Sequence, residues 1–69
     1  MKQVKDCNNH TVCYIDEETG YVEASYKKQT TSTYLSVGKS FQIVRNGAKT
    51  TITRVSDTKM KIERCHIAA

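Results

Sequence analysis

The chain has 69 residues, of which 38% are hydrophobic and 26% are charged, and eleven Lys and Arg against seven Asp and Glu give a formal net charge of +4. This length allows one domain near the lower limit of unaided folding, which we assign to residues 11–67, and leaves no room for a second. No apolar stretch is long enough to span a membrane, and residues 1–10 lack the apolar centre of a signal peptide. We therefore expect a cytoplasmic protein with no membrane association.

The first predicted elements form a hairpin. Residues 1–10 are polar and are expected to be an arm or a turn before the first strand. Residues 11–16 (TVCYID) and 21–26 (YVEASY) alternate β-branched and aromatic residues around the turn sequence EETG, which predicts two paired strands. A four-residue loop places on one apolar face the residues Cys13, Ile15, Val22, Ala24 and Tyr26.

The centre of the chain carries the strongest turn signal. Residues 27–33 (KKQTTST) are the most polar segment and are expected to form a mobile loop, followed by a short strand at residues 34–37. Asn46 and Gly47 then interrupt an alternating apolar pattern, and both tolerate the positive φ that a type I′ hairpin turn requires. A two-residue hairpin at this point places Phe41 opposite Ile52, with Ile43 on the same side.

The last predicted strand covers residues 59–67 (KMKIERCHI). An odd number of loop residues before it pairs Ile52 with Ile62 and keeps the apolar face continuous, whereas an even number would break that face. A competing interpretation ends residues 62–69 (IERCHIAA) as a helical turn, because Ala and Glu favour helix.

These elements predict an all-β fold, a small antiparallel meander of five to six strands. So small a sheet must cover its apolar face. We therefore expect a curled sheet or an SH3-like or open barrel, or a sheet completed by dimerisation.

The three cysteines are an odd number, which favours free thiols over a disulfide framework. Cys7, His10 and Cys13 are spaced three residues apart, but this spacing does not match paired C-x₂-C zinc motifs. We expect a buried Cys13, two incidental thiols and no cofactor. The alternative is a structural zinc held by Cys7, His10 and Cys65.

Catalytic motifs are absent from the sequence. Cys65 and His66 are adjacent, but neighbours on a strand point to opposite faces and cannot form a nucleophile–base dyad. Asp16, Glu17 and Glu18 fall in a turn expected to be fully solvated. We therefore expect a protein that is not an enzyme.

Two surfaces are candidates for binding. The first is a protein interface formed by Tyr14, Tyr21 and Tyr34, since tyrosine is favoured in such interfaces; the competing reading is a second layer of a closed barrel. The second is a basic face that could follow a phosphate backbone, or is simply a solvated outer face, formed by Lys27, Lys28, Lys49, Thr51, Thr53, Lys59 and Lys61. We expect an interaction module with a protein partner that also forms a homodimer, typical of accessory proteins of bacteria or mobile elements; nucleic-acid binding is the alternative.

Overall fold

The structure is a computed structural model that describes residues 1–26 and 28–67. These residues form seven strands and no helix, and therefore contain no helix long and apolar enough to cross a membrane. The strands are β1 (Lys2–Lys5), β2 (Thr11–Asp16), β3 (Tyr21–Tyr26), β4 (Gln29–Tyr34), β5 (Ser40–Arg45), β6 (Ala48–Ser56) and β7 (Lys59–His66).

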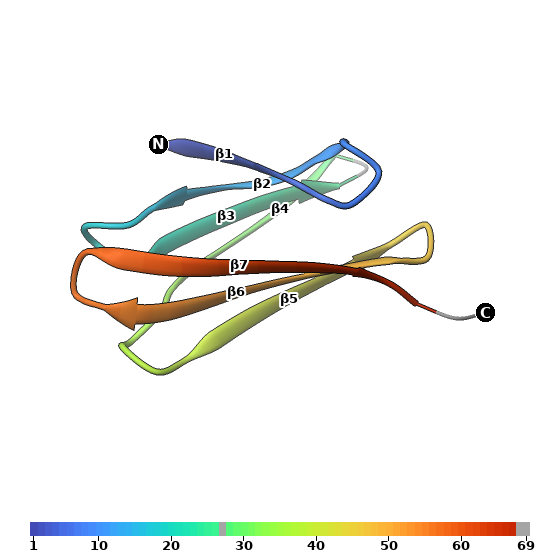
Figure 1. Cartoon of the computed structure of the whole chain (residues 1–69). Helices are drawn as coiled ribbons and strands as arrows, with labels where there is room; N and C mark the ends of the chain where they lie inside the picture. The colour runs from blue at the N-terminus through green and yellow to red at the C-terminus, as the bar shows by residue number, and fades with distance from the viewer. Residues whose placement is uncertain (27, 68–69) are drawn as a thin grey trace.

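The strands form two antiparallel sheets, one in the order β1-β2-β3-β4 and one in the order β5-β6-β7. Figure 1 shows them as two layers, with β1 to β4 on one side and β5 to β7 on the other. The all-β antiparallel prediction is confirmed. The strand count is seven instead of five or six, and the sheets do not close into a barrel, because no ladder joins β4 to β5 or β1 to β7 within the described residues.

The core lies between the two layers. Inward residues of both sheets join one buried cluster, with Phe41, Met60 and Ile62 packed against its margin; the cluster comprises Val4, Val12, Cys13, Ile15, Val22, Ala24, Leu35, Ile43 and Ile52. Each fully buried Ile or Val stabilises the fold by about 1.5 to 3 kcal/mol relative to an exposed position. Because each sheet covers the apolar face of the other, core burial requires no second copy of the chain.

The hairpin registers follow the sequence pattern. Ile15 pairs with Val22 in the first hairpin, and Phe41 pairs with Ile52 in the second. Asn46 and Gly47 have φ values of 51° and 74°, as a type I′ turn requires. These pairings confirm the predicted turns.

The predicted odd number of residues between the paired positions of β6 and β7 is confirmed, and a β-bulge produces it. Ile52 pairs with Ile62 and Arg54 with Met60, while the ladder shifts between Arg54 and Ser56. The extra residue is Val55, which is 49% exposed. A two-residue turn plus one bulged residue therefore keeps the apolar face continuous. The chain remains a strand through His66, so the helical alternative is wrong within the described residues.

Two strands lie in polar segments that the sequence pattern did not predict as strands. Residues 1–10 include β1, whose Val4 is fully buried against the core, so this segment is not an arm. Residues 29–33, expected in a mobile loop, form with Tyr34 the edge strand β4, which pairs with β3 from Tyr21–Tyr34 to Tyr26–Gln29. The strand predicted at residues 34–37 therefore ends at Tyr34. An edge strand contributes backbone hydrogen bonds more than apolar burial, so its sequence needs no apolar alternation. Residue 27 and the tail at 68–69 lie outside the described residues.

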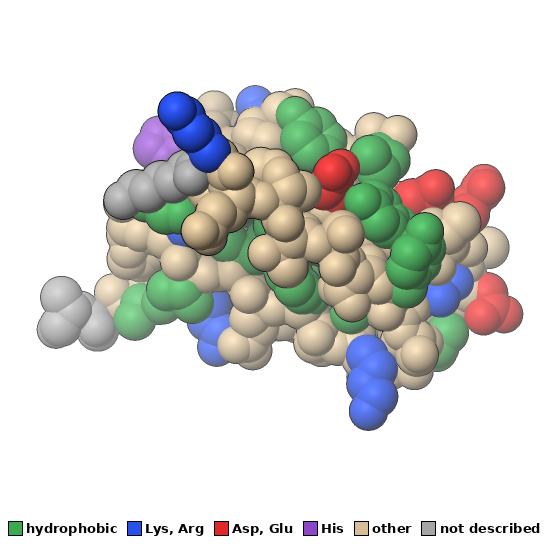
Figure 2. Space-filling view, turned by 180° about the vertical axis from the view of Figure 1, so that it is seen from behind, with side chains coloured by type: hydrophobic (Ala, Val, Ile, Leu, Met, Phe, Trp, Pro, Cys, Tyr) green, Lys and Arg blue, Asp and Glu red, His purple; other side chains and the backbone are tan. Residues whose placement is uncertain are grey.

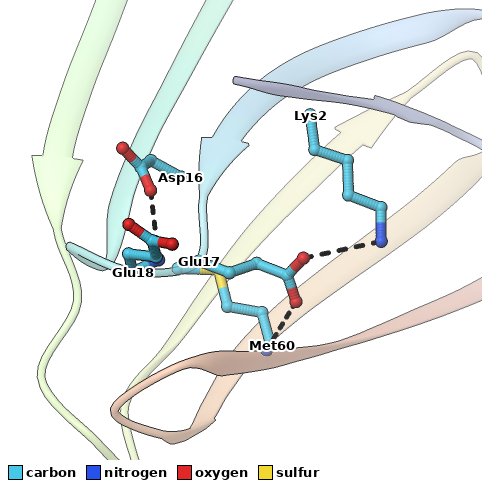
Figure 3. A network of polar contacts seen from close by, with 5 residues as sticks. All are labelled: Lys2, Asp16, Glu17, Glu18 and Met60. Atoms are coloured by element: carbon cyan, nitrogen blue, oxygen red, sulfur yellow. Dashed lines mark hydrogen bonds and ion pairs between the residues drawn. The ribbon is translucent and has the colours of Figure 1, made fainter.

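Polar side chains tie the two sheets together along the β1 and β7 edges. Glu17 is partly buried, and its carboxylate accepts a hydrogen bond from the Met60 backbone N–H at 3.1 Å and lies 3.7 Å from Lys2 Nζ (Figure 3). Arg64 Nε donates to the Lys5 carbonyl at 2.5 Å. The expectation that Glu17 is fully solvated is therefore wrong, because the opposite sheet supplies a donor that the hairpin alone does not contain.

Candidate protein interface

Three tyrosines lie together on the outer face of the four-stranded sheet. Tyr21 is paired with Tyr34 in the β3–β4 ladder, and their ring centroids are 5.1 Å apart with an interplanar angle of 55°. Tyr14 on β2 is the diagonal neighbour of Tyr21, because its direct partner on β3 is Glu23. Tyr34 is 70% exposed, Tyr14 is 42% exposed and Tyr21 is partly buried. We call these three residues the tyrosine face.

Carboxylates accompany the tyrosine face. Asp16 lies directly opposite Tyr21 across the β2–β3 ladder, and Glu23 lies directly opposite Tyr14. Figure 2 shows hydrophobic side chains grouped toward one end of the molecule, with acidic side chains beside and between them. Although the whole chain carries +4, two carboxylates share this face with the tyrosines, and each disfavours the approach of a phosphate group. The hairpin register predicted from the sequence already places Glu23 with Tyr14 and Tyr21, whereas Asp16 was expected in a solvated turn.

The predicted basic face is on the other sheet. Lys49, Thr51 and Thr53 alternate along β6 with the buried Thr50 and Ile52, so they point outward. Lys61 is the ladder partner of Thr53. We call Lys49, Thr51, Thr53 and Lys61 the lysine–threonine face.

The charge of the lysine–threonine face is interrupted. Lys61 Nζ lies 4.0 Å from the carboxylate of Glu63, which pairs across the ladder with Thr51. Lys49 is four positions along β6 from the partner of Lys61, a separation of about 13 Å at the rise of a strand. The two lysines therefore do not form a compact anion site.

The remaining predicted cations do not all join that face. Lys59 is exposed at the start of β7, beside the β6–β7 turn. Lys28 is in the turn between β3 and β4, on the other sheet, with φ of 67°. Lys27 lies outside the described residues. The described residues predicted to bind nucleic acid are thus divided between the two sheets.

The predicted zinc ligands Cys7, His10 and Cys65 are not brought together as a set. No group of three or more His, Cys, Asp or Glu side chains with the proximity of a metal site occurs in residues 1–26 and 28–67. Cys7 Sγ instead lies 3.6 Å from the Cys65 carbonyl oxygen and 3.6 Å from His66 Nδ1. The structure therefore gives the zinc alternative no support.

Cys13 is a core residue, as predicted, at 1% exposure. Burial raises the pKa of its thiol from 9.0 to about 11, although Arg45 acts in the opposite direction. Because the folded state holds the proton more tightly than the unfolded state, this contribution to stability is complete below pH 9 and is lost as the pH rises toward 11.

Chemical unfolding at increasing pH is therefore expected to show a loss of about 2 kcal/mol by pH 11 that depends on Cys13. Cys13→Ala should start from lower stability and lack this part of the decline. Tyrosine and lysine titrations affect both proteins, so the difference between the two curves isolates the thiol. Parallel curves for the two proteins would contradict the assignment.

A pocket of about 200 Å³ opens between the edge strands β4 and β5. Arg45 lies at its wall with its guanidinium carbon 4.5 Å from the centroid of the Tyr26 ring. Tyr26 was predicted in the core, but it is 48% exposed because β3 extends past the cluster at this end. The pocket is smaller than typical small-molecule sites, so we assign it no ligand. No sequence signal reveals it, since it depends on how the sheets stack.

No family model matches this chain, and neither does any curated protein or solved structure.

Proposed function

We propose that this protein is a non-enzymatic interaction module that binds a protein partner through the tyrosine face. The observation that carries the proposal is the grouping of Tyr14, Tyr21 and Tyr34 on one outer sheet face, with two of the rings in contact. Tyrosine buries a large area on binding while losing the freedom of only two side-chain torsions, and its hydroxyl can form hydrogen bonds at the margin.

The arrangement is suited to a protein in preference to a nucleic acid. Asp16 and Glu23 repel phosphates, whereas basic side chains of a protein can pair with them. Tyr34 also ends β4, an edge strand of its sheet, so its neighbouring backbone can pair with an extended segment of a partner. These features support a protein partner with basic or neutral surface chemistry.

Affinity capture from a lysate of the organism that carries the gene, with nuclease present, tests this proposal. The wild-type chain is expected to retain a specific protein, which is then identified by mass spectrometry. Tyr14→Ser/Tyr34→Ser should lose it, because these are the two most exposed rings of the face. Tyr26→Ser is a matched control, since Tyr26 is also exposed but lies at the opposite end of β3 from Tyr21. Equal retention by the wild-type chain and both variants would contradict the proposal.

Self-association stays a prediction. Two copies that meet through their tyrosine faces would bring Asp16 and Glu23 of each copy close to those of the other, so like charges oppose this arrangement at low salt. Light scattering across a dilution series should detect a dimer that becomes tighter as salt increases. Monomer mass at every concentration and salt would remove the dimer from the proposal.

Nucleic-acid binding is the second candidate, favoured by the outward alternation of Lys49, Thr51 and Thr53 on β6. Hydroxyls and ammonium groups on one flat face can both donate to phosphate oxygens. Binding of random DNA or RNA should then weaken steeply as salt increases and should be reduced in Lys49→Ser/Lys61→Ser. Undetectable binding at low salt would exclude this candidate.

The proposal includes a cytoplasmic location. The three cysteines are free thiols, and the cytosol keeps such thiols reduced.

A further inference from the structure

The thiol of Cys7 and the imidazole of His66 lie in contact between the two sheets. Cys7 is in the turn between β1 and β2, and His66 ends β7. Cys7 Sγ lies 3.6 Å from His66 Nδ1 and 3.6 Å from the Cys65 carbonyl oxygen, so the single thiol proton has an acceptor on either side. This contact joins residues 59 positions apart and arises only from the stacking of the two sheets.

The turn that carries Cys7 is held in place by Asp6. One carboxylate oxygen of Asp6 accepts hydrogen bonds from the backbone N–H groups of Asn8 and His10, each at 2.9 Å. The backbone N–H of His10 is the main cause that lowers the pKa of Asp6, so this carboxylate is ionised and the turn is formed at neutral pH. Cys7 is therefore presented to β7 by a defined turn instead of a flexible segment.

We propose that Cys7 is a reactive thiol and a site of covalent modification by small-molecule disulfides, with His66 as the acceptor of its proton. Cys7 Sγ attacks one sulfur of the disulfide, and a new S–S bond forms as the original S–S bond breaks. The thiol proton passes to His66 Nδ1, and the imidazolium then returns it to the departing thiolate. One small thiol is released for each chain modified, and no additional oxidant is consumed.

The other two cysteines make this inference specific. Cys13 is 1% exposed in the core and is therefore inaccessible to reagents. Cys65 is exposed, whereas Cys7 is only partly exposed, so exposure alone predicts that Cys65 reacts first. A nearby imidazole predicts the opposite order, because the thiolate is the reacting form and a base that removes the proton increases its supply.

The test is the rate of modification of each cysteine by oxidised glutathione at neutral pH, followed by peptide mass spectrometry on the intact folded chain. Cys7 is expected to acquire the adduct first, and Cys13 to remain unmodified. His66→Gln should slow the modification of Cys7 by about tenfold and leave the rate at Cys65 unchanged.

His10→Gln is the matched control, because His10 is in the same turn as Cys7 but contributes its backbone to the Asp6 interaction. It should leave the rate at Cys7 unchanged. Circular dichroism should show that each variant retains the β fold. Faster modification of Cys65 than of Cys7, or an unchanged Cys7 rate in folded His66→Gln, would overturn the inference.

Discussion

Replacement of Gly20 by alanine is expected to destabilise the fold by about 3 kcal/mol or more, which is sufficient to unfold much of a chain this small. Gly20 has φ of +82°, a conformation that residues with a side chain rarely adopt. An added Cβ would also meet the Leu35 carbonyl oxygen and would lie 2.7 Å from Arg54 Nη1. The backbone oxygen cannot move freely, since Leu35 is itself bonded to Gly20 through its N–H.

Urea unfolding measures this effect, and Gly38→Ala provides the control. Gly38 has φ of +89°, yet nothing lies within 4 Å of its added Cβ. Gly38→Ala should therefore report the conformational strain alone, about 1 kcal/mol. Similar losses in the two variants would show that close packing around Gly20 does not contribute.

Replacement of Arg54 by methionine is the second substitution with a large expected effect, about 3 kcal/mol. Arg54 Nη1 donates to the Leu35 carbonyl at 2.9 Å, and Nη2 donates to the carbonyls of Glu18 and Asp57 at 3.3 and 2.9 Å. These acceptors belong to three separate connecting segments. A methionine side chain cannot donate the hydrogen bonds that link them to Arg54. Arg54 therefore joins the connecting segments at this end of both sheets.

Thermal and urea unfolding of Arg54→Met should be compared with Arg64→Met. Arg64 is exposed and donates one hydrogen bond to the Lys5 carbonyl, so its loss should cost about 1 kcal/mol. Gly20→Ala combined with Arg54→Met should cost less than the sum of the two, because one clashing group is removed. Additive losses would argue against the contact between Gly20 and the guanidinium.

Local pattern was sufficient to predict the hairpins. Alternation placed Ile15 opposite Val22 and Phe41 opposite Ile52, and the backbone requirements of Asn46 and Gly47 fixed the central turn. The odd offset was predicted from the continuity of the apolar face, although the bulge that produces it could not be anticipated. Burial of one face specifies register strongly, which explains this success.

Pattern was insufficient where backbone pairing or sheet stacking decides the structure. β1 and β4 are polar strands stabilised by neighbours, so their sequences resemble loops. Alternation divides each hairpin into two faces but does not specify which faces meet. The contacts of Cys7 with His66 and of Glu17 with Met60 follow from that stacking and were therefore missed.

The candidate interface depends both on local sequence pattern and on how the strands pair and the sheets stack. The positions of Tyr14 and Tyr21 could be predicted from the first hairpin register. Tyr34 joins them because residues 29–34, predicted mainly as a loop, form β4 and pair with β3. The lysines predicted to bind nucleic acid do not share one surface, because Lys28 lies in the β3–β4 turn of the four-stranded sheet whereas Lys49 and Lys61 lie on the three-stranded sheet. The structure thus keeps the three tyrosines on one sheet face and divides the described lysines between the two sheets.

The most direct measurement is the Kd of the captured protein partner for three forms of the chain. We expect Tyr14→Ser/Tyr34→Ser to weaken binding about 100-fold relative to wild type, as loss of central aromatic contacts does. Lys49→Ser/Lys61→Ser should change the Kd by less than about fivefold, because rim or distant charges contribute little to affinity. A larger effect of the lysine pair, or an unchanged Kd in the tyrosine pair, would contradict the assignment of the interface to the four-stranded sheet.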